Sequence, residues 1–247
     1  MEGRGWTAAD VAPRIDLPHL MALQFAALFM ATAHNPELWQ TDFVVDHDQA
    51  PPLIHAVGWD LDHAFDDEPS HDTLAAQREF AGHDNERGPA QAMQLVLTLL
   101  DTDPAFRQTY LRYAERMMNH VLTPAWWDAR RLEARDGITP ARAERVATFF
   151  RERPALLSAS MAKGFDLPPP HVVHIDVRGD RHLTIDGYPH RGRYEGRYFE
   201  GGTLEVAVPP EARAGFRYFT VNGRREAEPL LRLPVTADLE VVARFGN

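Results

Sequence analysis

Residues 58–67, GWDLDHAFDD, carry four carboxylates and a histidine directly after the apolar stretch LIHAV. Asp60 and Asp62 are two positions apart, and residues at this spacing on a strand share one face. Two carboxylates so close repel each other unless a cation lies between them or one of them is protonated. Oxygen ligands of this kind suit Mg²⁺, which proteins bind through one or two carboxylates together with substrate phosphates. The pattern predicts a Mg²⁺ site, with a solvated acidic turn as the alternative.

Other metals and other chemistries have less support in the sequence. Mn²⁺ and Ca²⁺ accept the same kind of ligand, but an EF-hand is excluded because Ala64 and Phe65 stand where its loop needs a ligand and a glycine. Zn²⁺ stays open through His63, His71 or His83, although no HExxH spacing occurs. The chain also has no GxSxG, Walker or GxGxxG motif, so nothing indicates a nucleophilic hydrolase.

The net charge of -10 is concentrated in one segment of the chain. Residues 37–86 contain 13 acidic residues and one basic residue, Arg78, whereas residues 171–247 contain 11 of each kind. Nucleic-acid backbones require a basic surface, so we expect no nucleic-acid partner; a cation or a cation-bridged ligand is favoured instead. The absence of cysteine excludes disulfides and thiolate metal sites.

The longest apolar run covers residues 20–33, which is shorter than the roughly 20 residues needed to span a bilayer. Asp10 and Asp16 precede this run, where a signal peptide would carry basic residues. We therefore expect a buried helix, no membrane span and no signal peptide in this chain.

The segments around the acidic pair predict a helix, two strands and a loop. Asp16 caps a helix that runs to about Ala33. Residues 44–52 suggest a strand that ends in a turn, and residues 53–62 a buried strand that leads into the acidic pair. Residues 66–88 show no periodicity, so we expect a long loop there.

Helices are predicted again from Pro89 to about residue 165. Asp103-Pro104, Thr123-Pro124 and Thr139-Pro140 each place a capping side chain before a proline, which is the usual start of a helix. Pro154 is expected to break or restart the last helix. One core-facing helical stripe is predicted from spacings of three and four residues, and its members are Phe106, Tyr110, Tyr113, Met117 and Val121.

The hydrophobic period changes from helical to two after the stiff linker DLPPPH, residues 166–171. Asn222-Gly223 predicts a hairpin turn. Tyr198, Phe199 and Phe219 are expected in the core, because aromatic residues in strands usually face inward. The sequence therefore predicts an α+β protein with two domains, a helical region (1–167) and a small antiparallel β module (168–247).

The order of several motifs resembles the spore-coat-protein-H-like (CotH) family of atypical protein kinases. NPELWQTDF, a strand–turn–strand, WDLDHAF and LLDTDPAFRQTYLRYAERMM follow one another as in the kinase domain of that family. RVATFFRERPALLSASMAKGFDL resembles the segment that closes this domain, and GRYEGRYFEGGTLEVAVPPEARAGFRYFTVNG resembles the β module after it. The resemblance covers residues 15–247 and implies that the helical region is similar to a kinase carboxy-terminal lobe.

The resemblance implies roles for four residues. Asp60 would hold Mg²⁺ against the phosphates of ATP, and Asp62 would steady this ion or bind a second one. Glu37 falls where the family has its catalytic aspartate, although His34 is close enough to align there instead. Asp42 falls where the family has a metal-binding asparagine, so it would contact the metal and the nucleotide.

The family uses Mg·ATP to phosphorylate protein hydroxyl groups, which implies protein substrates of a spore coat or cell surface. This chain departs from the family at Glu37, Asp42 and Asp66, where the family has aspartate, asparagine and glycine. Residue 15 already corresponds to the larger lobe, and the only lysine, Lys163, falls in the last helix. We therefore expect the carboxy-terminal portion of such a kinase, inactive as this chain alone.

Two alternatives stay open. The altered residues also fit a non-catalytic, pseudokinase-type binding protein of a spore coat or cell surface, and the acidic segment by itself fits a calcium-stabilised structural domain. The sequence does not specify the phosphoacceptor, the oligomeric state or the cellular location.

Overall fold

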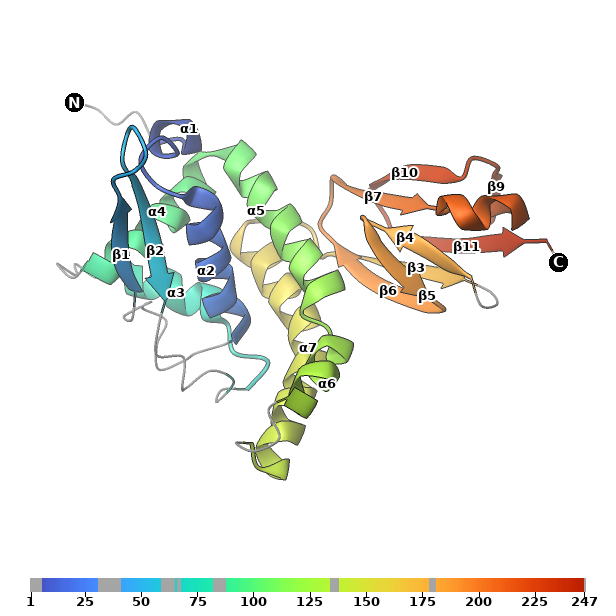
Figure 1. Ribbon diagram of the computed structural model, residues 1–247, viewed down its shortest axis with the longest axis horizontal. Coiled ribbons are helices and arrows are strands. Elements are labelled where there is room, and N and C mark those ends of the chain that lie inside the picture. Colours follow the sequence, from blue (N-terminus) through green and yellow to red (C-terminus); the bar gives the residue numbers. More distant parts are fainter. Residues whose placement is uncertain are drawn as a thin grey trace. The chain divides into compact units, whose positions relative to one another are not determined.

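The computed structural model describes residues 6–30, 41–58, 65, 68–81, 88–133, 138–177 and 181–246. The chain divides into two compact units. The first unit comprises residues 1–114 and 124–165, and the β unit comprises residues 115–123 and 166–247. In Figure 1 the first unit holds most of the helices and one hairpin, whereas the β unit holds the orange and red strands. The predicted mixed α+β class is confirmed.

The first unit consists of helices and a two-stranded hairpin. In chain order its elements are α1 (Ala8–Val11), α2 (Leu17–Met30), β1 (Thr41–Asp46), β2 (Leu53–Gly58), α3 (Thr73–Ala81), α4 (Gly88–Thr102), α5 (Pro104–Arg116), α6 (Pro124–Glu133) and α7 (Pro140–Gly164). The last two residues of α5 belong to the β unit.

The predicted helix starts are confirmed, because they depend on local contacts. The Asp16 carboxylate accepts the His19 N–H (3.1 Å) at the start of α2. The Asp103 carboxylate accepts the N–H groups of Ala105 and Phe106 (both 3.0 Å) at the start of α5. The α6 and α7 helices begin at Pro124 and Pro140, as the Thr-Pro pairs predict.

The core of the first unit lies between α2, α5 and α7. Phe25 and Phe29 of α2 are buried and pack against Tyr110, Phe149 and Phe150 at ring-centroid distances of 5.4–6.5 Å. Gln24 lies fully buried in the same helix, where its side chain contacts Gln77 (2.8 Å) and the Tyr110 hydroxyl. Burial raises the pKa of Tyr110 well above its usual value, so its hydroxyl stays protonated and donates to Gln24.

Two expectations for the helices were wrong. The predicted loop 66–88 contains the helix α3. The sequence of α3 shows no apolar periodicity, because two of its buried residues, Thr73 and Gln77, are polar. The α7 helix continues through Pro154 although proline removes one helical hydrogen bond. Phe150 and Leu157 are buried on either side of this proline, and their packing holds the helix together.

None of the helices in the described ranges has both the length and the apolar character to cross a bilayer. Residues 20–30 of the apolar run belong to α2, which is 14 residues long.

The β unit contains two sheets and two short helices. Its elements are η1 (Met117–Val121, a π-helix), β3 (His171–Val177), β4 (His182–Ile185), β5 (Tyr188–Arg191), β6 (Arg193–Tyr198), β7 (Gly202–Ala207), η2 (Pro210–Gly215, a 3₁₀ helix), β8 (Phe216–Val221), β9 (Arg224–Glu226), β10 (Leu230–Val235) and β11 (Leu239–Phe245). One sheet has the strand order β10-β7-β4-β5 and the other β6-β3-β11-β8-β9.

The two sheets share one core, as the two-residue period predicts. Tyr198, Phe199 and Phe219 are buried, so their predicted place in the core is confirmed. The predicted turn at Asn222-Gly223 joins β8 to β9, and both of its residues have positive φ (46° and 81°). The pairing differs from the expectation at one place, because β3 and β11 run parallel. These two strands lie at opposite ends of the module sequence, so no hairpin constrains their direction.

Candidate functional site

The structure locates one of the four predicted site residues. Asp42 lies in β1 and pairs with Val57 of β2. Glu37, Asp60 and Asp62 lie outside the described residues, so their grouping around a metal stays a prediction. Among the residues that are described, no three His, Asp or Glu side chains lie close enough to hold one ion.

The structure does show how the chain is held on both sides of the predicted acidic site. The β2 strand ends at Gly58, immediately before the WDLD motif. Phe65, the last residue of the WDLDHAF block, donates its N–H to the Met30 carbonyl (3.1 Å). Its ring packs against Phe149 and Phe150 of α7, with centroid distances of 5.1 and 5.7 Å. Both ends of the block are thus fixed to ordered elements.

The side chain of Arg153 in α7 binds the segment that follows this block, residues 69–73. Its side chain is 1% exposed, and all five guanidinium N–H groups have acceptors. Nε donates to the Phe29 carbonyl (3.1 Å), and Nη1 donates to the carbonyls of Pro69 (2.8 Å) and His71 (2.6 Å). Nη2 donates to the Leu28 carbonyl (2.5 Å) and the Thr73 hydroxyl (2.6 Å).

These bonds join three segments through one side chain. The carbonyls of Leu28 and Phe29 belong to the last turn of α2, where a positive charge is favourable against the helix dipole. Residues 69–73 lead into α3. Arg153 therefore fixes the end of α2, the entry to α3 and the middle of α7 in one arrangement. We assign it a positioning role.

A second polar cluster lies in the β unit, around His120 of η1. The His120 side chain is fully buried, and its Nε2 lies 3.2 Å from Asp186 Oδ2. Its Nδ1 lies 3.0 Å from Nε2 of His190, a half-buried residue of β5. The ring is stacked between Tyr188 and Tyr194, with centroid distances of 4.8 and 5.6 Å. Both nitrogens of His120 are therefore occupied by protein partners.

Asp186 connects this cluster to the sheets. It occupies the β4–β5 turn with φ 49°, followed by Gly187 with φ 87°, an arrangement that favours Asp-Gly. Its carboxylate accepts the Tyr198 hydroxyl (2.6 Å) and the Glu205 N–H (2.9 Å) as well as facing His120. Burial raises the pKa of Tyr198 far above its usual value, which keeps this hydroxyl a donor.

Two neighbours of His120 fix the rest of segment 115–123 to the module. The Asn119 amide bonds both the N–H (3.0 Å) and the carbonyl (2.9 Å) of Arg197 in β6. The Glu115 carboxylate accepts the Phe199 N–H (2.6 Å). The contacts of Glu115, Asn119 and His120 hold the segment in place, and the His120 side chain is fully buried. We interpret the cluster as structural.

The sequence does not reveal this cluster, because His120 and His190 stand at no spacing that predicts a site. Asp186-Gly187 is a readable turn signal, but its partner His120 stands 66 residues earlier in the chain. A histidine in a π-helix is a further clue, since single-turn π-helices are frequent at special sites, yet their position cannot be read from composition.

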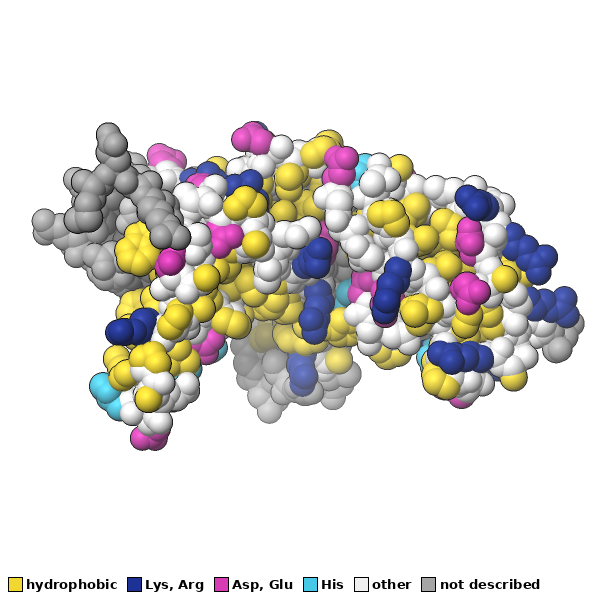
Figure 2. All heavy atoms as spheres, turned by 90° about the horizontal axis from the view of Figure 1, so that it is seen from above, with side chains coloured by type: hydrophobic (Ala, Val, Ile, Leu, Met, Phe, Trp, Pro, Cys, Tyr) yellow, Lys and Arg dark blue, Asp and Glu magenta, His cyan; other side chains and the backbone are white. Residues whose placement is uncertain are grey.

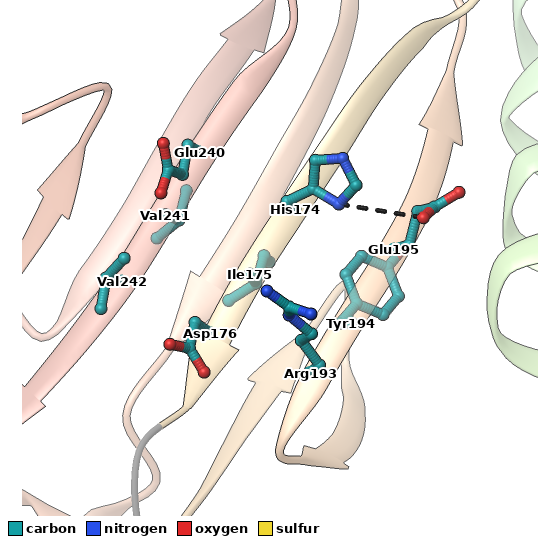
Figure 3. Close-up of a pocket in the computed structure, with 9 residues that line it drawn as sticks. All are labelled: His174, Ile175, Asp176, Arg193, Tyr194, Glu195, Glu240, Val241 and Val242. Atoms are coloured by element: carbon teal, nitrogen blue, oxygen red, sulfur yellow. Dashed lines mark ion pairs between the residues drawn. The ribbon is translucent and has the colours of Figure 1, made fainter.

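Charged side chains line one face of the strands β6, β3 and β11 in the β unit. A hollow of about 550 Å³ lies over these strands. Figure 3 shows its polar side chains, which are His174 and Asp176 from β3, Arg193 and Glu195 from β6, and Glu240 from β11. We call these five residues the outer face.

The strand registers set the charge pattern of the outer face. His174 pairs with Glu195 on one side and with Glu240 on the other, so a histidine stands between two carboxylates. Its Nδ1 lies 3.9 Å from Glu195 Oε2, the dashed line in Figure 3. Asp176 pairs with Arg193 in the adjacent row. Across the visible surface of this unit, Figure 2 shows basic and acidic side chains interspersed.

Comparisons with known proteins give no family assignment: no protein-family model, curated protein or solved structure matches this chain.

Proposed function

We propose that this chain is a non-catalytic binding protein whose β unit recognises a basic segment of a partner protein on the outer face. The observation that supports the proposal is the hollow over β6, β3 and β11. Its lining contains three carboxylates, those of Asp176, Glu195 and Glu240, and one guanidinium group, that of Arg193. All of these side chains come from neighbouring strands of one sheet, so the surface is rigid and needs little ordering when a ligand binds.

The chemistry of the outer face favours a cationic side chain as its ligand. Glu195 and Glu240 flank His174 on adjacent strands and are both exposed, so an ammonium or guanidinium group can approach them from solvent. Arg197 already donates to Glu195 (3.0 Å), which leaves Glu240 as the stronger acceptor of this pair for an incoming group. The hollow is shallow and charged, which suits a partner surface better than an apolar small molecule.

A titration with a basic peptide tests this proposal. The probe is a fluorescein-labelled Gly-Arg-Gly-Lys-Gly-Arg-Gly peptide, whose glycines disfavour strand formation. We expect measurable binding that weakens with salt and falls by about tenfold when Glu195→Gln and Glu240→Gln are combined. The control pair Glu200→Gln with Glu228→Gln removes the same charge from exposed positions elsewhere in the β unit. Equal loss in both pairs would reduce the effect to net charge and contradict a specific site.

The kinase-like interpretation of the first unit is a second proposal. It is supported by the way in which β2 leads into the WDLDHAF block and Phe65 closes that block against α2 and α7. In the parent activity, Asp60, Asp62 and Asp42 would hold Mg²⁺ against ATP phosphates and Glu37 would orient the acceptor hydroxyl of a coat or surface protein.

Calorimetric titration with Mg·ATP, together with a labelled-phosphate assay on a generic protein, tests the second proposal. Residues 37–86 would repel free ATP, so only a metal bridge can attach it. We expect weak, metal-dependent nucleotide binding and no phosphoryl transfer by this chain alone. Clear incorporation of phosphate would show that this chain is itself a kinase.

A further inference from the structure

The β1 strand is an edge strand with an unusually apolar surface. Among the described residues it pairs with β2 only. Three consecutive side chains, Phe43, Val44 and Val45, are 43%, 53% and 44% exposed. Edge strands are normally protected by charges, proline or a bulge, because their unpaired backbone groups attract other strands. None of these devices interrupts Phe43–Val45.

The hydrogen bonds of β2 show which backbone groups of β1 face the open edge. The Ile54 N–H donates to the Arg14 carbonyl (2.8 Å), and the Ile54 carbonyl accepts the Asp16 N–H (2.9 Å). Both groups of Ile54 thus point away from β1, so its antiparallel partner Val45 belongs to a non-hydrogen-bonded pair. By alternation, Val45 and Phe43 both direct their N–H and carbonyl groups to the outer edge.

The two faces of β1 differ in character. Phe43 and Val45 share a face with Ala56 of β2, which is 1% exposed because α2 packs against β2. This apolar face is covered over β2 and open over β1. By strand alternation, Val44 and Asp46 share the other face.

We propose that the outer edge of β1 binds an extended strand of a partner protein in which apolar and basic residues alternate. Such a strand would bond the backbone groups of Phe43 and Val45 that face away from β2, cover the apolar face with one set of side chains and place a basic side chain of the other set near Asp46. Residues 37–86 have 13 acidic residues and one basic residue, so a basic partner is attracted whereas a second copy of this chain is repelled. This site is separate from the outer face and does not depend on it.

Fluorescence anisotropy with the labelled peptide Lys-Val-Arg-Val-Arg-Val-Lys tests the proposal on the full chain. Val45→Pro removes an outward N–H and adds a ring at the edge, but it leaves the bonds to β2 intact. Val45→Thr keeps the shape and the N–H and is the matched control. We expect Val45→Pro to weaken binding by about tenfold or more, and Val45→Thr to stay within about threefold of the original chain. Equal binding by both variants would overturn the proposal.

Two modified peptides test the proposal on the unmodified chain, so the result does not depend on whether the Val45→Pro variant folds. One peptide carries N-methyl groups on its valines and the other on its arginines, so each blocks one edge of the strand. Strand addition predicts that only one of the two loses binding; equal affinities would refute it. Failure of the unmodified peptide to bind, or equal binding of Glu-Val-Glu-Val-Glu-Val-Glu, also contradicts the proposal. Dimerisation of the chain that Val45→Pro abolishes would assign the edge to a second copy instead.

Discussion

Replacing Arg153 with methionine should lower the free energy of unfolding of the first unit by about 3 kcal/mol. Methionine is long enough to fill much of the site but donates no hydrogen bond. The five acceptors of Arg153 would each lose the hydrogen bond from its guanidinium group.

The size of this loss in stability depends on which acceptors of Arg153 keep another hydrogen-bond donor. The Leu28 carbonyl still accepts the Thr73 hydroxyl (2.9 Å), and the His71 carbonyl still accepts the Thr73 N–H (3.0 Å). The Thr73 hydroxyl remains a donor to Leu28. Within the described part of the chain, the carbonyls of Phe29 and Pro69 keep no other donor. Leaving a buried carbonyl without a donor costs about 1–3 kcal/mol. Pro69 is only partly buried, so the lower half of this range applies.

Thermal unfolding followed by tryptophan fluorescence measures this change selectively, because all five tryptophans belong to the first unit. A loss of about 3 kcal/mol corresponds to a fall in Tm of about 6–12 °C. Arg153→Lys should lose most of the same stability, since one ammonium group cannot reach acceptors on both sides of the planar fork.

Arg151→Met is the matched control on the same helix. The Arg151 side chain is 51% exposed and bonds Glu144 (3.2 Å) and Thr148 (2.7 Å) at the surface. Its replacement should change stability by about 0.5 kcal/mol or less. If Arg153→Met were as mild as Arg151→Met, Arg153 would not hold the three segments together.

Three further predictions concern other sites. Burial, and to a lesser extent the neighbouring His120, lowers the pKa of His190 in the folded state. The unfolded chain therefore binds the proton more readily, so stability should fall as pH drops below about 6.5. Calorimetry at pH 7.5 and 5 should show a smaller fall in stability for His190→Gln than for the original chain. The N–H groups of Ala8 and Phe106 lower the pKa of Asp103, so its contribution is present above about pH 4 and is lost as the pH falls through the lowered pKa. Asp103→Ala should cost about 1 kcal/mol at pH 7 in a denaturant titration, and this cost should shrink in acid. Millimolar Mg²⁺, Mn²⁺ or Ca²⁺ should raise the Tm of the first unit, and Asp60→Asn should abolish this rise; identical melting curves with and without metal would favour a solvated acidic turn.

Features that depend on neighbours in the sequence could be predicted. The helix starts at Asp16, Asp103 and Thr139 depend on one side chain and the N–H groups that follow it. The hairpin turn at Asn222-Gly223 depends on two residues that tolerate positive φ. The change of hydrophobic period likewise separates strands from helices without any knowledge of the fold.

Features that depend on tertiary contacts could not be predicted in the same way. Arg151 and Arg153 stand in the same stretch, RERP, yet one is exposed and the other fully buried, because the acceptors of Arg153 come from residues 28–73. The α3 helix escaped prediction because two of its buried residues, Thr73 and Gln77, are polar and bond distant partners. The parallel pairing of β3 with β11 joins the two ends of the module, which no local signal encodes.

The central claim is that the outer face of the β unit binds a basic protein segment. Backbone amide spectra of the full chain, recorded during titration with the Gly-Arg-Gly-Lys-Gly-Arg-Gly peptide, test it most directly. We predict saturable shifts that are concentrated at His174, Asp176, Glu195 and Glu240, and that disappear when Glu195→Gln and Glu240→Gln are combined. Shifts spread evenly over acidic residues of both units, or no shifts at millimolar peptide, would contradict the claim.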